Sequence, residues 1–192
     1  MKNILEIADL VGGGTPSKLN ETYWNGNIPF FTPSDFSSYI FAMETLESIS
    51  KEGLNSSSTK LFSKGTIFLT ARGSVGNLMI ASRDMSMNQS CYALRAKDSK
   101  YIFVYFSTIN IIGYLKAKSS GSVFNSIVSN DIKNTPVIIP TNILRDRFEF
   151  IAKPLFEKIL INLKQNQELA QLREWLLPML MNGQVKVESD LN

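Results

Sequence analysis

Residues 140–187 read PTNILRDRFEFIAKPLFEKILINLKQNQELAQLREWLLPMLMNGQVKV. Strong helix formers fill this stretch, and an apolar stripe with a polar centre runs along it. The stretch closes on Pro178 and Gly183, residue types that stop helices. A helix over 145–177 would be roughly 50 Å long at about 1.5 Å per residue, more than a neighbouring domain of 140 residues needs. The stretch therefore predicts a long C-terminal helix that finds a partner.

The apolar stripe of this helix marks its expected dimerisation face. A wide stripe with a polar centre is typical of the seam between paired helices, where one buried Asn can fix the register. The alternative is that the helix folds back on its own domain and its Asn residues face water. Pro154 is an interior proline, which costs about 3 kcal/mol, so we expect a bend or a restart there. The expected dimerisation residues are Leu155, Ile159, Leu163, Asn166, Leu169, Arg173, Leu176 and Leu180.

The rest of the chain changes character often, with short apolar runs between turn signals. Runs typical of strands occupy 66–70, 78–81, 91–95 and 137–139, and Asn25-Gly26 is expected to form a tight turn. Residues 101–115 predict an amphipathic helix, with apolar residues at helical spacing at 102, 105, 106, 109, 112 and 115. The prediction is an α+β protein, with a mixed domain at 1–140 and a spacer or dimerisation helix with a C-terminal tail at 141–192.

Composition narrows the class of protein. The 192 residues suffice for one or two domains with an ordinary core. The single cysteine, Cys91, excludes an internal disulfide and indicates a reducing compartment. Without a signal peptide or an apolar run of about 18 residues, a cytoplasmic protein that does not enter a membrane is expected. Net charge is +3, and this excess lies in residues 1–140, where a phosphate backbone could use it.

The residues offer little for catalysis. There is no histidine, which excludes Ser–His and Cys–His pairs and imidazole zinc ligands. Residues 12–18, GGGTPSK, superficially resemble a phosphate-binding P-loop, but Leu19 stands where that motif needs Ser or Thr. This segment is either a plain turn or a loop whose N–H groups meet a DNA phosphate. We expect no catalytic residue, no bound cofactor and no metal.

Polar side chains that suit DNA gather in five segments. Arg suits guanine, Asn and Gln suit adenine, and lysine and hydroxyl groups suit phosphates. Lys116 and the residues after it are expected to form a basic, hydroxyl-rich loop. The candidate DNA-binding residues are Gly13, Gly14, Thr15, Ser17, Lys18, Thr32, Ser34, Asp35, Arg72, Gly73, Ser74, Asn88, Gln89, Lys118, Ser119, Ser120, Gly121 and Ser122.

Taken in order, these pieces resemble one target-recognition domain and one spacer helix of the specificity subunit of type I restriction–modification systems. The resemblance covers nearly the whole chain. It rests on GGGTPSK…YWNGNIPFFTPSDF (12–36), KGTIFLTARGSVGN…MNQSCYAL (64–94), KSSGSVFNSIVSNDIKNTPVIIP (118–140) and LREWLLPMLMNG (172–183). A usual member has two recognition domains and two antiparallel spacer helices, whereas this chain has one of each. It therefore resembles a half-length form, either a natural half subunit or a fragment of a two-domain subunit.

The resemblance implies a function without catalysis by the chain itself. Such subunits read a bipartite target in double-stranded DNA and hold modification subunits that methylate adenine with S-adenosylmethionine. Restriction subunits join through the complex to translocate and cut, so S-adenosylmethionine, ATP and Mg²⁺ are implied only for partner subunits. With one helix per chain, a homodimer through that helix is expected. The alternative is a DNA-binding regulator that dimerises through its helix and has no methyltransferase partner.

Overall fold

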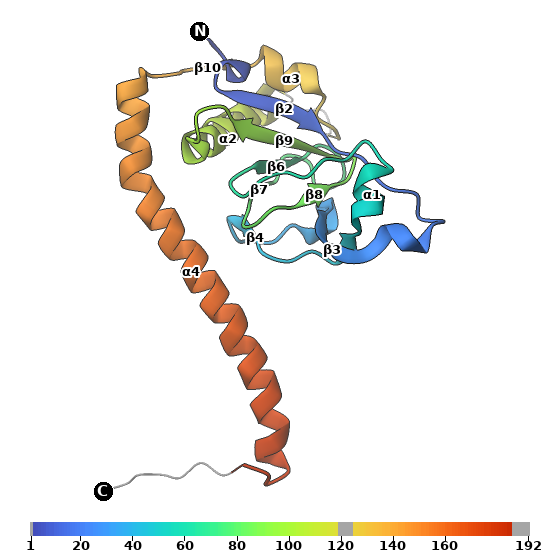
Figure 1. Ribbon diagram of the computed structural model, residues 1–192. Helices are drawn as coiled ribbons and strands as arrows, with labels where there is room; N and C mark the ends of the chain where they lie inside the picture. Colours follow the sequence, from blue (N-terminus) through green and yellow to red (C-terminus); the bar gives the residue numbers. More distant parts are fainter. Residues whose placement is uncertain (1, 119–124, 186–192) are drawn as a thin grey trace, which may run out of the picture. The chain divides into compact units, whose positions relative to one another are not determined.

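The computed structural model describes residues 2–118 and 125–185 (Figure 1). Two compact units divide the chain, Met1–Ala152 and Lys153–Asn192. The strands are β1 Lys2–Asn3, β2 Ala8–Gly12, β3 Trp24–Phe31, β4 Phe41–Ala42, β5 Glu47–Ile49, β6 Ile67–Thr70, β7 Leu78–Ala81, β8 Ser86–Met87, β9 Cys91–Ala96 and β10 Pro136–Val137. The helices are α1 Lys51–Asn55, α2 Tyr101–Lys118, α3 Ser129–Asn134 and α4 Asn142–Met181, with 3-10 turns η1 Ile4–Glu6, η2 Glu21–Tyr23 and η3 Pro33–Asp35. The predicted α+β class with a long C-terminal helix is confirmed.

Three sheets build the first unit. The largest has the order β2-β9-β6-β7-β4, in which β4 pairs parallel to β7 and the other neighbours pair antiparallel. The second sheet has the order β5-β3-β8, with β3 antiparallel to β5 and parallel to β8. The short antiparallel pair of β1 and β10 ties the N-terminal strand to the segment that precedes α4.

An apolar core joins the two larger sheets. Phe68 of β6 is fully buried, and its ring centroid lies 5.1 Å from that of Phe31 on β3 and 5.8 Å from that of Phe62. All four residues of β6 are buried, which is typical of a strand covered on both faces. This core holds β3 and β6 together, and the loops that follow these two strands are thereby fixed relative to each other.

One local prediction for the first unit is wrong. Asn25-Gly26 is not a turn between two segments but lies inside β3, where Trp24 and Ile28 both face Ile49 across a bulge. Asn25 adopts the left-handed conformation, with φ 58°, that lets the strand absorb the extra residues. A methyl group placed at Gly26 would lie 2.5 Å from the Ile49 carbonyl oxygen, so the approach of β5 requires glycine there.

Helix α2 extends the predicted 101–115 segment, and its buried face only partly matches the predicted one, because Ile102, Tyr105 and Ile112 are buried as expected. Phe106 and Ile109, expected on the apolar face, are 42% and 40% exposed, whereas Val104, Thr108 and Ile111 are buried. The Thr108 hydroxyl donates a hydrogen bond to the Val104 carbonyl at 2.7 Å, so a threonine is accommodated in the core. The buried face of α2 was only partly predicted because this helix has no strongly polar side, so the spacing of its apolar residues fits more than one face.

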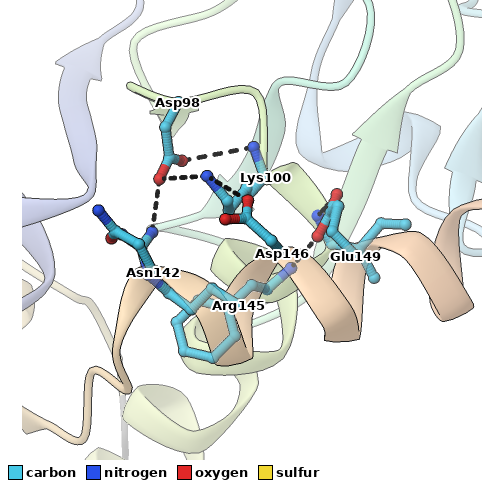
Figure 2. A network of polar contacts seen from close by, with 8 residues as sticks. Asp98, Lys100, Asn142, Arg145, Asp146 and Glu149 are labelled. Atoms are coloured by element: carbon cyan, nitrogen blue, oxygen red, sulfur yellow. Dashed lines mark hydrogen bonds and ion pairs between the residues drawn. The ribbon is translucent and has the colours of Figure 1, made fainter.

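A charged network fixes the first turns of α4 within the first unit (Figure 2). Arg145 Nη1 lies 2.6 Å from Asp98 Oδ2, and Lys100 Nζ lies 3.1 Å from the same oxygen and 3.0 Å from Asp146 Oδ1. The Glu149 carboxylate accepts hydrogen bonds of 3.1 and 3.2 Å from two amides in the first turn of α2, at residues 102 and 103. The two compact units divide at residue 152, inside the helix.

The network shifts the pKa of its members in opposite directions. Burial alone would raise the pKa of Asp98, but the hydrogen bond from Lys100 and the charge of Arg145 outweigh burial and hold that pKa below its ordinary value. Burial raises the pKa of Glu149 against the two amide hydrogen bonds that it accepts. The hydrogen bonds to Asp146 and Asp98 raise the pKa of Lys100.

Helix α4 continues through both of its prolines, so of the two alternatives expected at Pro154, a bend or a restart, the restart is wrong. The Phe150 carbonyl lacks its usual amide partner there, and because both residues are exposed, water can hydrate that oxygen. The helix also passes Pro178 and ends only at Met181. Gly183, with φ 68°, then closes it: its amide donates to the Leu180 carbonyl at 3.2 Å, and the next amide donates to the Met179 carbonyl at 2.9 Å.

Candidate nucleic-acid interface

Three of the five candidate segments meet through the loop before β9. The Thr15 hydroxyl donates a hydrogen bond to Gln89 Oε1, which joins segment 13–18 to segment 88–89. A methyl group placed at Gly13 would lie 2.0 Å from the carbonyl oxygen of Asn88, so these backbones touch. The Asn88 amide donates to the Phe31 carbonyl at 2.9 Å, immediately before segment 32–35.

The hairpin loop between β6 and β7 joins the same place. The Arg72 amide donates to the Ser90 carbonyl at 3.3 Å, which sets segment 72–74 beside the loop before β9. A methyl group placed at Gly73 would lie 3.7 Å from Pro33 Cβ, which sets the same segment beside η3. We call residues 13–15, 32–35, 72–74 and 88–89 the polar edge. Four segments that lie up to 76 positions apart in the sequence thus form one surface.

Gly13 and Gly14 serve packing rather than anion binding. The Gly13 amide donates to the Cys91 carbonyl at 3.3 Å, and the Gly14 amide donates to the Met87 carbonyl at 3.2 Å. Both N–H groups are therefore used within the fold, and neither is offered to a phosphate. The close approach of Asn88 to Gly13 leaves no room for a side chain, which explains the glycine.

Three other candidate residues hold their own loops in shape. Asp35 Oδ2 accepts hydrogen bonds from the Thr32 amide at 2.7 Å and the Thr32 hydroxyl at 2.8 Å, and its Oδ1 accepts from the Leu46 amide at 2.7 Å. The Asn88 side chain accepts a hydrogen bond of 3.0 Å from the Ser90 amide. Thr32, Asp35 and Asn88 are therefore anchors, because their polar atoms are committed to the backbone of the edge.

A fourth anchor, Thr70, was not among the sequence candidates. Its hydroxyl accepts a hydrogen bond of 3.1 Å from the Asn77 amide and donates one to the Ser74 carbonyl, so it bridges the two ends of the hairpin loop. Gly73 and Gly76 have φ of 78° and 83°, which lets the loop close tightly. A buried threonine at the end of an apolar strand, directly before a Gly-rich loop, is the sequence signal that could have identified it.

The other side chains of the polar edge that could contact a ligand are exposed, and we call them the tips. Ser34, Arg72, Ser74 and Gln89 are all exposed. Within residues 2–118 and 125–185, Arg72 takes part in no ion pair, so its charge is available to a ligand. The polar edge is therefore a set of exposed polar side chains on a backbone that is held by hydrogen bonds from neighbouring side chains.

The second half of segment 13–18 turns away to the smaller sheet. The Trp24 indole N–H donates to the Ser17 carbonyl at 3.0 Å. Lys18 Nζ lies 3.6 Å from the centroid of the Trp24 ring and forms an ion pair with Glu47 of β5. The positive charge of Lys18 is thus already compensated, unlike that of Arg72.

The last candidate segment is only partly described. Lys116 and Lys118 lie in the last turn of α2, so the prediction that they belong to a loop is wrong. Both are exposed, and a methyl group placed at Gly76 would lie 3.4 Å from Lys116 Nζ, which brings this end of α2 to the hairpin loop. Ser119, Ser120, Gly121 and Ser122 lie outside the described residues.

Among the described residues around this edge, few groups could act as a nucleophile or a metal ligand. Burial raises the pKa of the Cys91 thiol to about 12, so the thiol stays protonated and unreactive at neutral pH. Among the residues that the structure describes, no group of three or more His, Cys, Asp or Glu could hold a metal ion. Within the same residues, no helix has both the length and the apolar character that crossing a membrane requires.

Comparisons with known proteins agree with the resemblance seen in the sequence. The chain is 30% identical over 176 residues to the type I restriction enzyme MjaIX specificity subunit of Methanocaldococcus jannaschii, covering 89% of this chain and 40% of that protein. It is 25% identical to the HindI specificity subunit of Haemophilus influenzae, covering 96% of this chain and 41% of the relative. The chain therefore spans about two fifths of the length of these curated relatives.

Solved structures share the fold. The crystal structure of the HsdS subunit from Thermoanaerobacter tengcongensis superposes with a TM-score of 0.56 at 20% identity, covering 92% of this chain and 43% of that one. A chain from a study of complex assembly and conformational transition of the type I R-M system gives the same TM-score and identity, with 44% of that chain covered. The family described as type I restriction modification DNA specificity domain matches residues 1–171, so the chain belongs to that family.

Proposed function

We propose that this chain is the DNA-recognition subunit of a type I restriction–modification complex and that it directs adenine methylation and restriction without catalysing either. The observation that carries the proposal is the polar edge, where four distant segments bring their exposed polar tips to one surface. Family membership supports DNA as the ligand. It gives no support to the alternative of a free-standing regulator.

The tips carry groups that can form hydrogen bonds with the edges of bases. The guanidinium of Arg72 can make two hydrogen bonds to O6 and N7 of guanine in the major groove. The Gln89 amide accepts from Thr15, so its NH₂ group keeps its donors for a base or a phosphate. Ser34 and Ser74 add hydroxyl groups that act as donor or acceptor. The anchors beneath them would keep these groups in place, which lowers the entropy lost on binding.

We further propose that two copies pair through α4. Along its outer half the stripe of the helix exposes the large apolar side chains Leu169, 62% exposed, and Leu180, 39% exposed. Of the expected seam residues, Ile159, Leu163 and Leu176 are half-buried and the rest are exposed. Antiparallel pairing about Asn166 would cover this face and set the two recognition domains at opposite ends.

Such a dimer determines the form of the target. Two copies related by a two-fold axis read the same bases in opposite orientation, so the target is an interrupted palindrome. A helix of 40 residues is about 60 Å long at ~1.5 Å per residue, and it acts as a ruler between the two half-sites. This length is enough to separate them by more than one duplex turn of ~34–36 Å.

The remaining chemistry belongs to partners in this proposal. A modification subunit would bind S-adenosylmethionine and methylate adenine, and a restriction subunit would join through the complex and use ATP and Mg²⁺. The chain itself would bind double-stranded DNA, its modification subunit and a second copy. No cofactor is assigned to the chain.

Selection from a randomised duplex library tests the proposal. The wild-type chain should select one interrupted palindrome. Arg72→Ala should cost about 1–3 kcal/mol at one base pair per half-site and relax the preference there, because a bidentate contact is lost. Arg83→Ala is the matched control, since Arg83 is exposed after β7, at the end of the sheet away from the hairpin loop. A library that shows no preferred sequence for the wild type would refute the proposal.

A further inference from the structure

A groove adjoins the polar edge and has no part in the base reading described above. It has a volume of about 370 Å³ and is bounded by residues 36–40, by the turn at 76–78 and by residues of α2 between 105 and 116. Residues 36–40 directly follow segment 32–35, and residues 76–78 follow segment 72–74. Two of the four segments of the polar edge therefore continue into the walls of this groove.

The lining of the groove is amphipathic and carries positive charge. Ser37, Ser38, Asn77 and Lys116 supply hydroxyl, amide and ammonium groups, and no carboxylate lines the groove in the part of the chain that the structure describes. The apolar side includes Tyr39, which is 56% exposed. Such a lining matches a nucleic-acid backbone, in which an anionic phosphate alternates with an apolar deoxyribose.

Gly113 keeps the groove open. It lies inside α2, where glycine is less favourable than alanine, and a methyl group placed on it would meet no atom within 4 Å. Packing therefore does not require glycine at this position, unlike at Gly13. A larger side chain at Gly113 would instead fill space along the groove wall.

We propose that this groove binds the sugar–phosphate backbone of duplex DNA beside the recognised bases. Lys116 and the serine hydroxyls contact a phosphate, and Tyr39 packs on a deoxyribose. The inference rests on the proposed function, since it takes DNA to lie on the polar edge. Arg72 then determines which bases are chosen, while Lys116 adds affinity for every sequence.

Two variants of the full chain test the groove by separate means. Lys116→Gln removes the charge and should weaken binding roughly three- to tenfold, equally for the selected duplex and a scrambled one. The plot of log affinity against log salt should also flatten by about 0.9, the value for one lost phosphate contact. Gly113→Leu keeps the charge and fills the groove. It should weaken both duplexes alike with an unchanged melting temperature or a higher one, because leucine favours helix.

The matched control is Lys64→Gln, which removes an exposed lysine before β6, at the opposite end of that strand from the hairpin loop. Unchanged affinity and salt slope for both groove variants, with a relaxed preference for Arg72→Ala, would overturn the groove and leave the proposed function standing. A flattened slope for Lys116→Gln without any sequence preference in the wild type would support the groove and refute specific recognition. A loss for Lys116→Gln confined to the selected duplex would also overturn the inference, because a backbone contact carries no sequence information.

Discussion

The first unit and the outer half of α4 distribute their apolar side chains in opposite ways. In the first unit Phe31, Phe68 and their neighbours are buried and the polar loops are exposed. Beyond Lys153, by contrast, Leu155, Leu169 and Leu180 are exposed along the stripe of the helix, and further apolar side chains are exposed elsewhere on it. The difference indicates that the first unit carries a core of its own, whereas the helix has a face suited to a partner.

The largest effect is expected from changes to the helix face. Leu169→Asp with Leu176→Asp should convert a dimer to a monomer. Two leucines from each copy leave the interface, and each contributes about 1.5–3 kcal/mol when fully buried, so the loss exceeds about 6 kcal/mol. Light scattering at micromolar concentration should show half the wild-type mass.

The control double variant changes the net charge by the same amount, on the opposite side of the helix. Lys164→Gln with Gln171→Asp alters two exposed positions about half a turn away from the stripe and should leave the mass unchanged. A native chain that is monomeric at high concentration, with no modification subunit present, would contradict the dimer and remove the basis for a palindromic target.

The next effect concerns the core of the first unit. Phe68→Ala should lower the free energy of unfolding of that unit by about 3–5 kcal/mol, because a large buried ring is replaced by a cavity. Urea unfolding followed by near-ultraviolet circular dichroism measures the loss. The protein that remains folded should still have the mass of a dimer. If it has the mass of a monomer, dimerisation through the helix face depends on the core of the first unit.

Sequence reasoning located the parts that depend on local pattern. The strand at 78–81 and the start of α2 at Tyr101 follow from apolar runs and spacing, and the long helix follows from its composition. The bulge at Asn25 and the burial of Thr108 depend on partners distant in sequence, so no local pattern reports them.

The residues of the polar edge also could be predicted only in part from local sequence. Residue type alone was enough to select Arg72 and Gln89, but not to separate them from anchors such as Asp35 and Asn88. That separation depends on which backbone amides lie within reach, which only the folded chain determines. Whether the selected tips contact DNA stays a prediction.

A smaller effect is expected at the charged network, and it depends on pH. Asp98→Asn should lower the free energy of unfolding at pH 7 by about 2 kcal/mol, since hydrogen bonds to a charged acceptor contribute ~1.5–3 kcal/mol. The folded pKa of Asp98 is depressed, so its stabilisation is present above its unfolded pKa of about 3.9 and is lost as pH falls through the folded value. The difference between wild type and variant should therefore shrink from pH 5 to pH 2.

Glu149 provides an internal contrast within that network. Its folded pKa is raised, so its contribution has the opposite sign: it is largest below the unfolded pKa and declines as pH rises through the folded value. Unfolding of Asp98→Asn in urea at pH 7 and pH 3 separates the two groups. A difference in unfolding free energy between wild type and Asp98→Asn that stays constant with pH would show that the charge of Asp98 does not stabilise the packing of the first turns of α4.

The smallest effect is expected at the helix end. Gly183→Ala places a side chain in the left-handed conformation, at a cost of roughly 1–2 kcal/mol, and should fray only the last turn of α4. Hydrogen exchange should accelerate at the amides of Gln184 and its neighbours, while urea unfolding of the first unit stays unchanged. Loss of stability in the first unit would indicate coupling that the division into two units does not predict.

The separation of anchors from tips has a consequence for how such proteins diversify. Thr70, Asp35 and Asn88 satisfy the backbone of the polar edge, so this frame does not depend on which residues occupy positions 34, 72 and 74, whereas Gln89 takes part in it through Thr15. Substitutions at these three positions should therefore change the chemistry of the surface at little cost in folding. On the proposed function, new target preferences lie few substitutions apart, and the edge can diversify without loss of the fold.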